Sequence, residues 1–210
     1  MQNLEISNFI KNTQVSRETI HSLKKYEKMI IERNISLNLI GKSTINTIWD
    51  RHFLDSAQVI DLIDKNYKIL VDLGSGAGFP GLILSIIAKD RKMPIKIKLI
   101  EKSPKKSKFL RDVLDNLHTN AEVINENIFS EEKKVSGDVF VARAFKPLPR
   151  ILQLIHSKTE NWKKIIIFLG KTGKNELLEA SKSWHIEYKQ TMSITNKDSI
   201  ILEINNLKKK

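Results

Sequence analysis

The first third of the chain carries the hydrophobic pattern of amphipathic helices. Apolar side chains recur every three or four positions and predict one buried helical face, made of Ile20, Leu23, Tyr26 and Ile30. Ser16 suits the N-cap of this helix because its hydroxyl can accept a hydrogen bond from a free backbone N–H. The pattern breaks at residues 38–41, and a second apolar run then predicts another helix over residues 44–64.

From residue 68 onward, short apolar runs alternate with helical patterns. The runs predict strands at residues 69–73, 95–100, 121–124, 138–142, 165–169, 186–194 and 200–204. The intervening segments predict helices at residues 82–88, 105–117 and 175–183, together with one opened by Pro147. Alternating strands and helices indicate a mostly parallel sheet covered on both faces. The last two strands, joined by a polar turn, indicate an antiparallel edge.

These patterns divide the chain into three parts. Residues 1–66 are expected to form an N-terminal helical extension, and residues 67–207 an α/β domain. The basic residues 208–210 are expected to form a disordered tail.

The charge of the chain is strongly positive, with 36 Lys and Arg against 24 Asp and Glu and a net charge of +12. This excess favours an anionic partner, either nucleic acid or an acidic membrane face, although a lysine-rich genome composition would produce it too. The chain has no cysteine and its five histidines lack metal-site spacing, so we expect no metal. It shows no signal peptide and no apolar run of about 18 residues, so we expect a cytoplasmic protein without a membrane partner.

A glycine-rich stretch after the first predicted strand is the strongest functional signal. Residues 71–81 read Val-Asp-Leu-Gly-Ser-Gly-Ala-Gly-Phe-Pro-Gly, with Gly74, Gly76 and Gly78 at alternate positions after Asp72. Glycines at a strand end let the backbone approach a ligand closely, and the following helix start offers free N–H groups. The G-x-G-x-G spacing resembles motif I of class I methyltransferases, whereas dinucleotide-binding folds use G-x-G-x-x-G. A purely structural glycine turn is the alternative.

Glu101 ends the second predicted strand. An acidic side chain there can accept hydrogen bonds from both ribose hydroxyls of an adenosine-containing cofactor, which suits NAD and S-adenosylmethionine equally. A surface glutamate is the structural alternative. A basic run follows, comprising Lys102, Lys105, Lys106, Lys108 and Arg111. The run is equally consistent with a phosphate-binding face and with a solvated helix face.

Four segments together carry a resemblance to a known family: Asn38-Leu39, Arg51-His52-Phe53-Leu54-Asp55-Ser56, the glycine stretch 71–81, and Ala142-Arg143-Ala144-Phe145. In this combination the sequence, from Tyr26 to Lys171, resembles the RsmG family, also called GidB. The resemblance implies an α/β fold, a class I methyltransferase Rossmann-like sheet behind an N-terminal helical extension. It also implies methyl transfer from S-adenosyl-L-methionine to N7 of a guanine in bacterial 16S ribosomal RNA.

The resemblance also implies roles for individual residues. Phe79 matches a cofactor contact in the glycine loop, and Asn127 and Ile128 match the pair beside the adenine. With the motif residues, the expected cofactor contacts are Gly74, Gly76, Gly78, Phe79, Glu101, Asn127, Ile128 and Arg143. His52, Arg143 and Lys171 match residues expected to position the substrate.

Two positions depart from the family pattern. The pair at 127 and 128 usually includes a glutamate, and here it is Asn127-Ile128, which keeps backbone contacts but loses a side-chain contact. The lysine after the fifth strand is usually followed by glycine, and here Thr172 follows Lys171. We therefore expect the backbone of the loop after Lys171 to differ in conformation from that of family members with glycine there.

One set of polar residues and one isolated arginine need an explanation. His52, Asp55 and Ser56 share one helical face, but adjacent helical turns do not give triad geometry. A structural hydrogen-bond cluster and a substrate contact are therefore equally good interpretations. Arg143 ends an apolar strand, where an unpaired charge is costly. We expect its partner to be a cofactor carboxylate, an RNA phosphate or the edge of a guanine.

Methylation of guanine N7 needs no general base, because this atom carries a lone pair and no proton. Proximity and orientation can supply the catalysis, so we assign no catalytic residue. Other functions stay open: an NAD-dependent oxidoreductase, a methyltransferase of another RNA or of a small molecule, and a non-enzymatic rRNA-binding protein. The expected partner is 16S rRNA or a small ribosomal subunit particle, bound by a monomer. The exact target nucleotide is not encoded in any motif.

Overall fold

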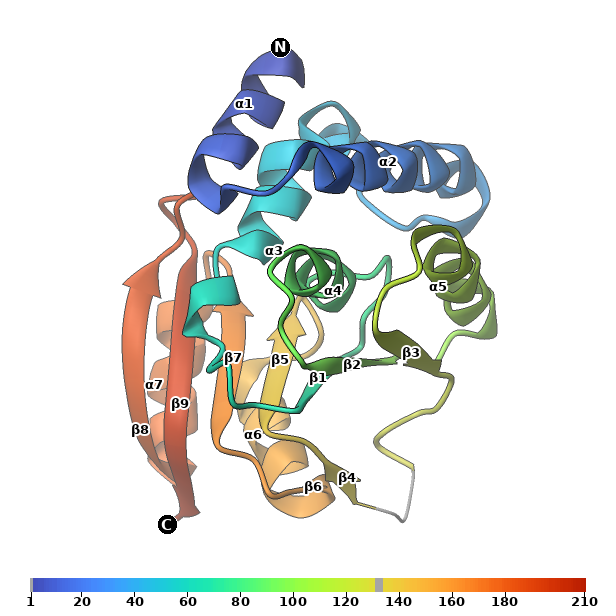
Figure 1. Ribbon diagram of the computed structural model, residues 1–210. Helices are drawn as coiled ribbons and strands as arrows, with labels where there is room; N and C mark the ends of the chain where they lie inside the picture. The colour runs from blue at the N-terminus through green and yellow to red at the C-terminus, as the bar shows by residue number, and fades with distance from the viewer. Residues whose placement is uncertain (1, 131–133) are drawn as a thin grey trace.

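The computed structural model describes residues 2–130 and 134–210, and its centre is a seven-stranded sheet (Figure 1). In spatial order the strands are β3 (Ala121–Ile124), β2 (Lys96–Ile100), β1 (Ile69–Leu73), β5 (Val139–Arg143), β7 (Lys164–Leu169), β9 (Ile200–Lys209) and β8 (Trp184–Met192). The first five run parallel, whereas β9 pairs antiparallel with both β7 and β8. The predicted parallel sheet with an antiparallel edge is confirmed.

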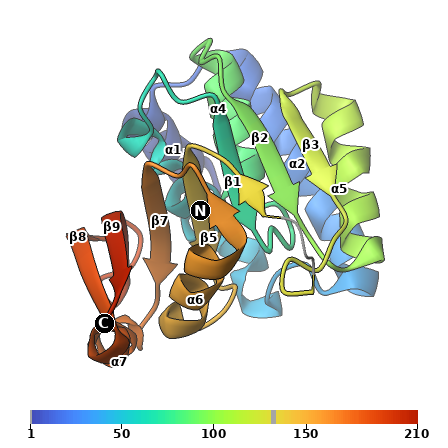
Figure 2. The ribbon, with the colours of Figure 1, turned by 90° about the horizontal axis from the view of Figure 1, so that it is seen from below.

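Helices cover both faces of this sheet (Figure 2). One face carries α4 (Gly81–Asp90) and α5 (Pro104–Leu117), and the other carries α6 (Leu148–Lys158) and α7 (Gly173–Ser183). Alternate strand residues point to opposite faces, so the near-continuous apolar strands supply two separate hydrophobic cores. In β5, Val139 and Val141 belong to the core under α4 and α5, whereas Phe140 and Ala142 belong to the core under α6 and α7.

The N-terminal helices add a second layer over α4 and α5. Helix α1 (Gln2–Thr13) was not predicted, while α2 (Arg17–Leu37) has the predicted N-cap, with Ser16 Oγ accepting a hydrogen bond from Thr19 N at 3.2 Å. Helix α2 ends where the pattern breaks, at Asn38 in the left-handed region. Its buried side chains join the core that also contains α4 and α5. The predicted boundary between residues 66 and 67 stays a prediction, and Met1 lies outside the described residues.

The predicted helical stretch over residues 44–64 is helical, but it is not one regular α-helix. This segment contains a 3-10 turn (Lys42–Thr47), a π turn (Trp49–Leu54), one turn of α-helix (Asp55–Ala57) and a second 3-10 turn (Ile60–Leu62). Two carbonyl oxygens of the π turn accept hydrogen bonds from the Arg143 side chain, so this segment is held by a contact with β5. The sequence pattern locates the helical segment but cannot show this long-range contact.

The C-terminus is also more ordered than expected. Strand β9 continues to Lys209, and Lys208 and Lys209 pair with His185 and Trp184 of β8. The prediction of a disordered tail is therefore wrong for these two lysines, because β8 begins at Trp184, before the predicted start at residue 186, and gives them a ladder partner. Two further short strands, β4 (Val135–Ser136) and β6 (Thr159–Glu160), pair with each other and were not predicted. None of the described helices has the length and apolar character needed to cross a bilayer.

Candidate functional site

The glycine loop leaves the carboxyl end of β1 and turns into α4. Gly74, Gly76 and Gly78 all have positive φ, at 73°, 58° and 108°, a region that L side chains rarely adopt. The N–H groups of Gly74 and Ser75 both donate to the carbonyl oxygen of Ile100, at 2.9 and 3.0 Å. The alternating glycines therefore allow a loop that is fastened to the end of the neighbouring strand β2.

The glycines of this loop do not all face the same way. Gly74 and Gly76 line a cavity at the carboxyl ends of the strands, as a cofactor loop requires. A Cβ on Gly74 would collide with the ring of Phe145, which also lines that cavity. Gly78 does not line the cavity, and a Cβ on it would press on the Tyr26 hydroxyl of α2. Gly78 is therefore required by packing, and its predicted cofactor contact finds no support in this placement.

Asp72 supports the loop from beneath. Its side chain is fully buried, and its Oδ2 accepts a hydrogen bond from Gly81 N at 3.0 Å. Its Oδ1 is buried without a hydrogen-bond partner among the described residues. Burial raises the pKa of this carboxyl to about 7, with smaller opposing contributions from its hydrogen bonds. Asp72 thus fastens the loop to the start of α4 and does not face the cavity.

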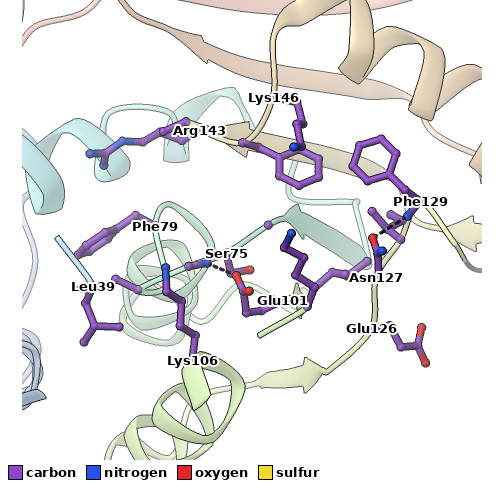
Figure 3. Close-up of a pocket in the computed structure, with 18 of the residues that line it drawn as sticks. Leu39, Ser75, Phe79, Glu101, Lys106, Glu126, Asn127, Phe129, Arg143 and Lys146 are labelled. Carbon is purple, nitrogen blue, oxygen red and sulfur yellow. Dashed lines mark hydrogen bonds between the residues drawn. The ribbon is translucent and has the colours of Figure 1, made fainter. Parts of the chain in front are cut away.

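The cavity has a volume of about 550 Å³, within the usual range for small-molecule sites (Figure 3). Glu101, at the end of β2, is buried and lines it. Glu101 Oε2 accepts from Gly76 N at 2.9 Å, and Oε1 accepts from Ser103 N at 2.8 Å. Each carboxylate oxygen keeps a further acceptor site, so a pair of hydroxyl groups in the cavity could bind there.

The loop after β3 forms the opposite wall of the cavity. Asn127 and Ile128 both line it, as expected, and the Asn127 side chain accepts from Phe129 N at 3.3 Å. Phe129 stacks on Phe145 with ring centres 5.7 Å apart, and the Arg150 guanidinium lies 5.5 Å from the Phe129 ring centre. Sequence reasoning missed Phe129 and Arg150. It quoted Phe145 only within a motif, although an aromatic residue after a strand-ending arginine was a usable signal.

Arg143 also lines the cavity, but its guanidinium points away from Glu101 (Figure 3). Its Nε donates to Asp55 Oδ2 at 3.2 Å. Nη1 donates to His52 O and Ser56 Oγ, and Nη2 donates to Arg51 O and His52 Nδ1, at 2.7 to 3.3 Å. Arginine has five N–H donors, and all are used. The protein itself therefore balances the charge through Asp55, a partner for Arg143 that the sequence analysis did not name.

His52 is held in the same cluster. Its Nδ1 accepts from Arg143, so Nε2 carries the proton and donates to Thr44 Oγ1 at 2.8 Å. Its ring stacks on Phe79 with ring centres 5.0 Å apart, and both residues line the cavity. Burial, reinforced by the adjacent Arg143, lowers the pKa of His52 to about 3. His52 is therefore neutral at physiological pH and contributes shape rather than charge.

Asp55 connects this cluster to the C-terminal hairpin. Its Oδ1 accepts from Ser193 Oγ at 3.1 Å and from Thr195 Oγ1 at 2.8 Å, both after β8. Of the two interpretations of His52, Asp55 and Ser56, the structural hydrogen-bond cluster is the one that the contacts support. The cluster fastens the end of β5 to the π turn and to the β8–β9 connection.

Comparison with known proteins places the chain in a family. The GidB family model, described as rRNA small subunit methyltransferase G, matches residues 19–204. A protein named Ribosomal RNA small subunit methyltransferase G from Pelagibacter ubique is 44% identical over 203 residues, which cover 96% of this chain and 95% of the relative. A protein of the same name from Rickettsia felis is 36% identical over 93% of this chain and 98% of the relative. The chain belongs to the GidB family.

Solved structures of low sequence identity share the fold of this GidB-family protein. A SAM-dependent methyltransferase from Aquifex aeolicus matches with a TM-score of 0.57 at 12% identity, covering 75% of this chain and 92% of that one. A TehB-like SAM-dependent methyltransferase from Corynebacterium glutamicum matches with a TM-score of 0.55 at 14% identity, covering 79% and 93%. The expected class I methyltransferase fold is confirmed.

The family resemblance also pointed to residues that lie apart from the cavity. Lys171 follows β7, is exposed, and lines neither the cavity at the glycine loop nor a neighbouring one beside the end of β7. Its neighbour Thr172 donates to Glu176 Oε1 at 2.7 Å, so the threonine in place of the family glycine begins α7 without a break. In the basic run, Lys106 lines the cofactor-sized cavity while Lys105 and Lys108 project into solvent. The roles of Lys171 and of the run stay predictions.

Proposed function

We propose that this chain transfers a methyl group from S-adenosyl-L-methionine to N7 of a guanine in 16S ribosomal RNA. The observation that carries the proposal is the cavity at the ends of β1, β2 and β3, where a glycine loop faces a buried carboxylate in a GidB-family chain. The net charge of +12 supports an RNA substrate. We expect a cytoplasmic monomer that acts on the RNA or on a small-subunit particle.

The cavity fits an adenosine-containing cofactor. Glu101 would accept hydrogen bonds from the ribose hydroxyls, because both of its oxygens are fixed at the cavity wall and retain free acceptor sites. Asn127 and Ile128 would flank the adenine through their backbone, which does not require the usual glutamate. Gly74 and Gly76 would let the backbone approach the rest of the molecule. These are proposed contacts for the residues predicted from the sequence.

The chemistry asks little of the protein beyond placement. The bound cofactor supplies an electrophilic methyl group, which the N7 lone pair of guanine takes as the carbon–sulfur bond breaks. His52 is neutral and hydrogen-bonded on both ring nitrogens, and Asp72 is buried behind the loop. Neither is placed to act as a base, and none is needed. The protein therefore accelerates the reaction by holding two reactants in line.

A titration and a methylation assay test this proposal. S-adenosylmethionine and S-adenosylhomocysteine should bind in isothermal titration, and NAD should not. Small subunits and naked 16S rRNA from a strain that lacks the gene serve as substrates, and mass spectrometry locates N7-methylguanine. Binding of NAD alone would support an oxidoreductase. Cofactor binding without rRNA methylation would support a small-molecule methyltransferase, and rRNA binding without cofactor binding a non-enzymatic role.

A further inference from the structure

A second cavity of about 430 Å³ lies beside the β5–α6 turn. Four residues of this turn, Arg143, Ala144, Phe145 and Lys146, line both this cavity and the first one. Ala144 adopts the left-handed region with φ 48°, which produces the sharp turn. The second cavity therefore adjoins the first cavity at this turn.

The lining of the second cavity is mixed in character. Ile151 and Phe168 give it an apolar part, which suits the face of a ring. Arg51 and Lys146 are exposed at its edge and carry positive charge. Glu176 lines it as well and carries negative charge. A nucleotide would match this lining: its planar base suits the apolar part, and its phosphate suits the cations at the edge.

We infer that the second cavity receives the target guanine, turned out of its RNA stack. This inference rests on the proposed function. In methyl transfer the acceptor atom attacks the methyl carbon from the side opposite the sulfur, so two adjoining cavities that share the lining of one turn provide one place for each reactant. Enzymes that modify a base draw it out of the helix into a fitted pocket. Arg51 and Lys146 would then contact the phosphates on either side of the guanine.

Glu176 gives the cavity a preference for guanine. Its Oε2 accepts from Leu148 N at 2.8 Å and its Oε1 accepts from Thr172 Oγ1 at 2.7 Å, which fixes the carboxylate. Each oxygen keeps another acceptor site for the N1–H and N2–H donors of guanine, a pair that adenine lacks. Methylation at N7 makes the base cationic, and a carboxylate in the cavity also stabilises that charge.

The hydrogen bonds of Arg143 keep the β5–α6 turn in place. Since all N–H donors of Arg143 are engaged by residues 51–56, its guanidinium does not compete for N7 of the incoming base. It instead fixes the strand end from which Ala144 and Phe145 project. Arg143 is therefore a positioning residue, which acts through the turn that it anchors.

Gly170 offers a test that fills the second cavity without disturbing the first. It lines the second cavity only, its φ is not positive, and a Cβ added there would meet no atom within 4 Å. We compare Gly170→Ala, Gly170→Leu and Gly170→Trp in single-turnover methylation of the RNA substrate, with S-adenosylhomocysteine titration and thermal melting as controls. Gly170→Trp should lower kcat/KM at least about 10-fold, Gly170→Leu less, and Gly170→Ala less than about twofold.

The affinity for S-adenosylhomocysteine and the Tm should stay close to wild type across the series. Full activity of Gly170→Trp, or an equal loss in Gly170→Ala, would overturn the inference. If the Trp variant does not fold, Gly170→Leu decides in the same way. Failure of the proposed function is distinguishable, because the wild-type protein itself would then bind no cofactor or form no N7-methylguanine in rRNA.

Discussion

At the scale of single residues, the site is governed by groups that hydrogen bonds within the protein hold in place. All N–H groups of Arg143 donate to the segment from Arg51 to Ser56. Both carboxylate oxygens of Glu101 accept from the backbone, one from Gly76 and one from Ser103. Such groups lose no orientation entropy when a ligand arrives, because the fold has already fixed them. Their contribution is therefore preorganisation rather than mobility.

Arg143→Ala should lower both stability and activity. The substitution leaves Asp55, whose side chain is mostly buried, without its cation and leaves two carbonyl oxygens of the π turn without their donor. Breaking a buried ion pair typically costs about 3 kcal/mol of unfolding free energy, and we expect a loss of that order. Urea denaturation measures it. The exposed Arg150 is the matched control, since Arg150→Ala should change the unfolding free energy little. An unchanged Arg143→Ala midpoint would contradict the cluster's role.

Asp72 should make stability depend on pH in an unusual direction. Its pKa in the fold is about 7, above the ordinary value of 3.8, so the folded state holds a proton that the unfolded state releases between these values. Its contribution is complete below pH 3.8 and is lost as the pH rises towards 7. The free energy of unfolding of wild type, minus that of Asp72→Asn, should therefore fall over this window by at most about 1.4 kcal/mol per pH unit. A difference independent of pH would mean that Asp72 is ionised in the fold.

At the scale of elements, regular segments were predictable and irregular ones were not. Strands β1, β5 and β7 are short apolar runs between polar boundaries, so local sequence determines them. The segment from Lys42 to Leu62 changes helical pitch along its length, and two carbonyl oxygens of its π turn bond to Arg143, far along the chain. Helix α1 escaped prediction because its apolar positions are few, and it is stabilised by packing, as by Phe9 against Trp49. Long-range contacts leave no trace in local periodicity.

Substitutions at two glycines of the loop should have very different effects on S-adenosylhomocysteine affinity. Gly74→Val should abolish S-adenosylhomocysteine binding, because a side chain there meets Phe145 and is strained at positive φ. Gly76→Ala is the control, since its Cβ would have ordinary contacts and suffers only the φ strain, about 1 kcal/mol. Titration calorimetry gives the affinities, and circular dichroism should stay near native for both. Equal affinities in the two variants would show that the Phe145 contact is unimportant.

At the scale of the whole molecule, the candidate site draws on segments that are distant in sequence. Motifs in the sequence predicted Gly74, Gly76, Phe79, Glu101, Asn127 and Ile128, and all of them line the first cavity. The partner of Arg143 and the second cavity depend on how β5, α7 and the β8–β9 connection meet. No local sequence pattern shows how these three segments pack against one another. The sequence therefore predicted the loop side of the site far better than the side that faces the substrate.

The positive charge should make RNA binding depend on salt, with a measurable share from α5. Lys105 and Lys108 are exposed there, and each phosphate contact contributes about 0.9 to the slope of log K against log salt. Lys105→Ala with Lys108→Ala should flatten the slope for rRNA by up to about 2. Removing the same charge from Lys208 and Lys209, on β9 near the opposite edge of the sheet from α5, should leave the slope unchanged. Equal slopes in both double variants would assign the α5 lysines to a solvated face.

The contact between Tyr26 and the glycine loop has a consequence for local opening of the molecule. The Tyr26 hydroxyl of α2 donates to the carbonyl oxygen of Ala77, and its ring packs beside Phe79. Undocking α2 would therefore remove the support under two residues that line the first cavity. By thermodynamic linkage, a ligand that binds only the closed form raises the free energy of that undocking by RT ln(1 + [L]/Kd). Amide hydrogens in α2, none of which faces the ligand, then exchange more slowly with solvent when the cavity is filled, and the N-terminal helices report on occupancy at a distance.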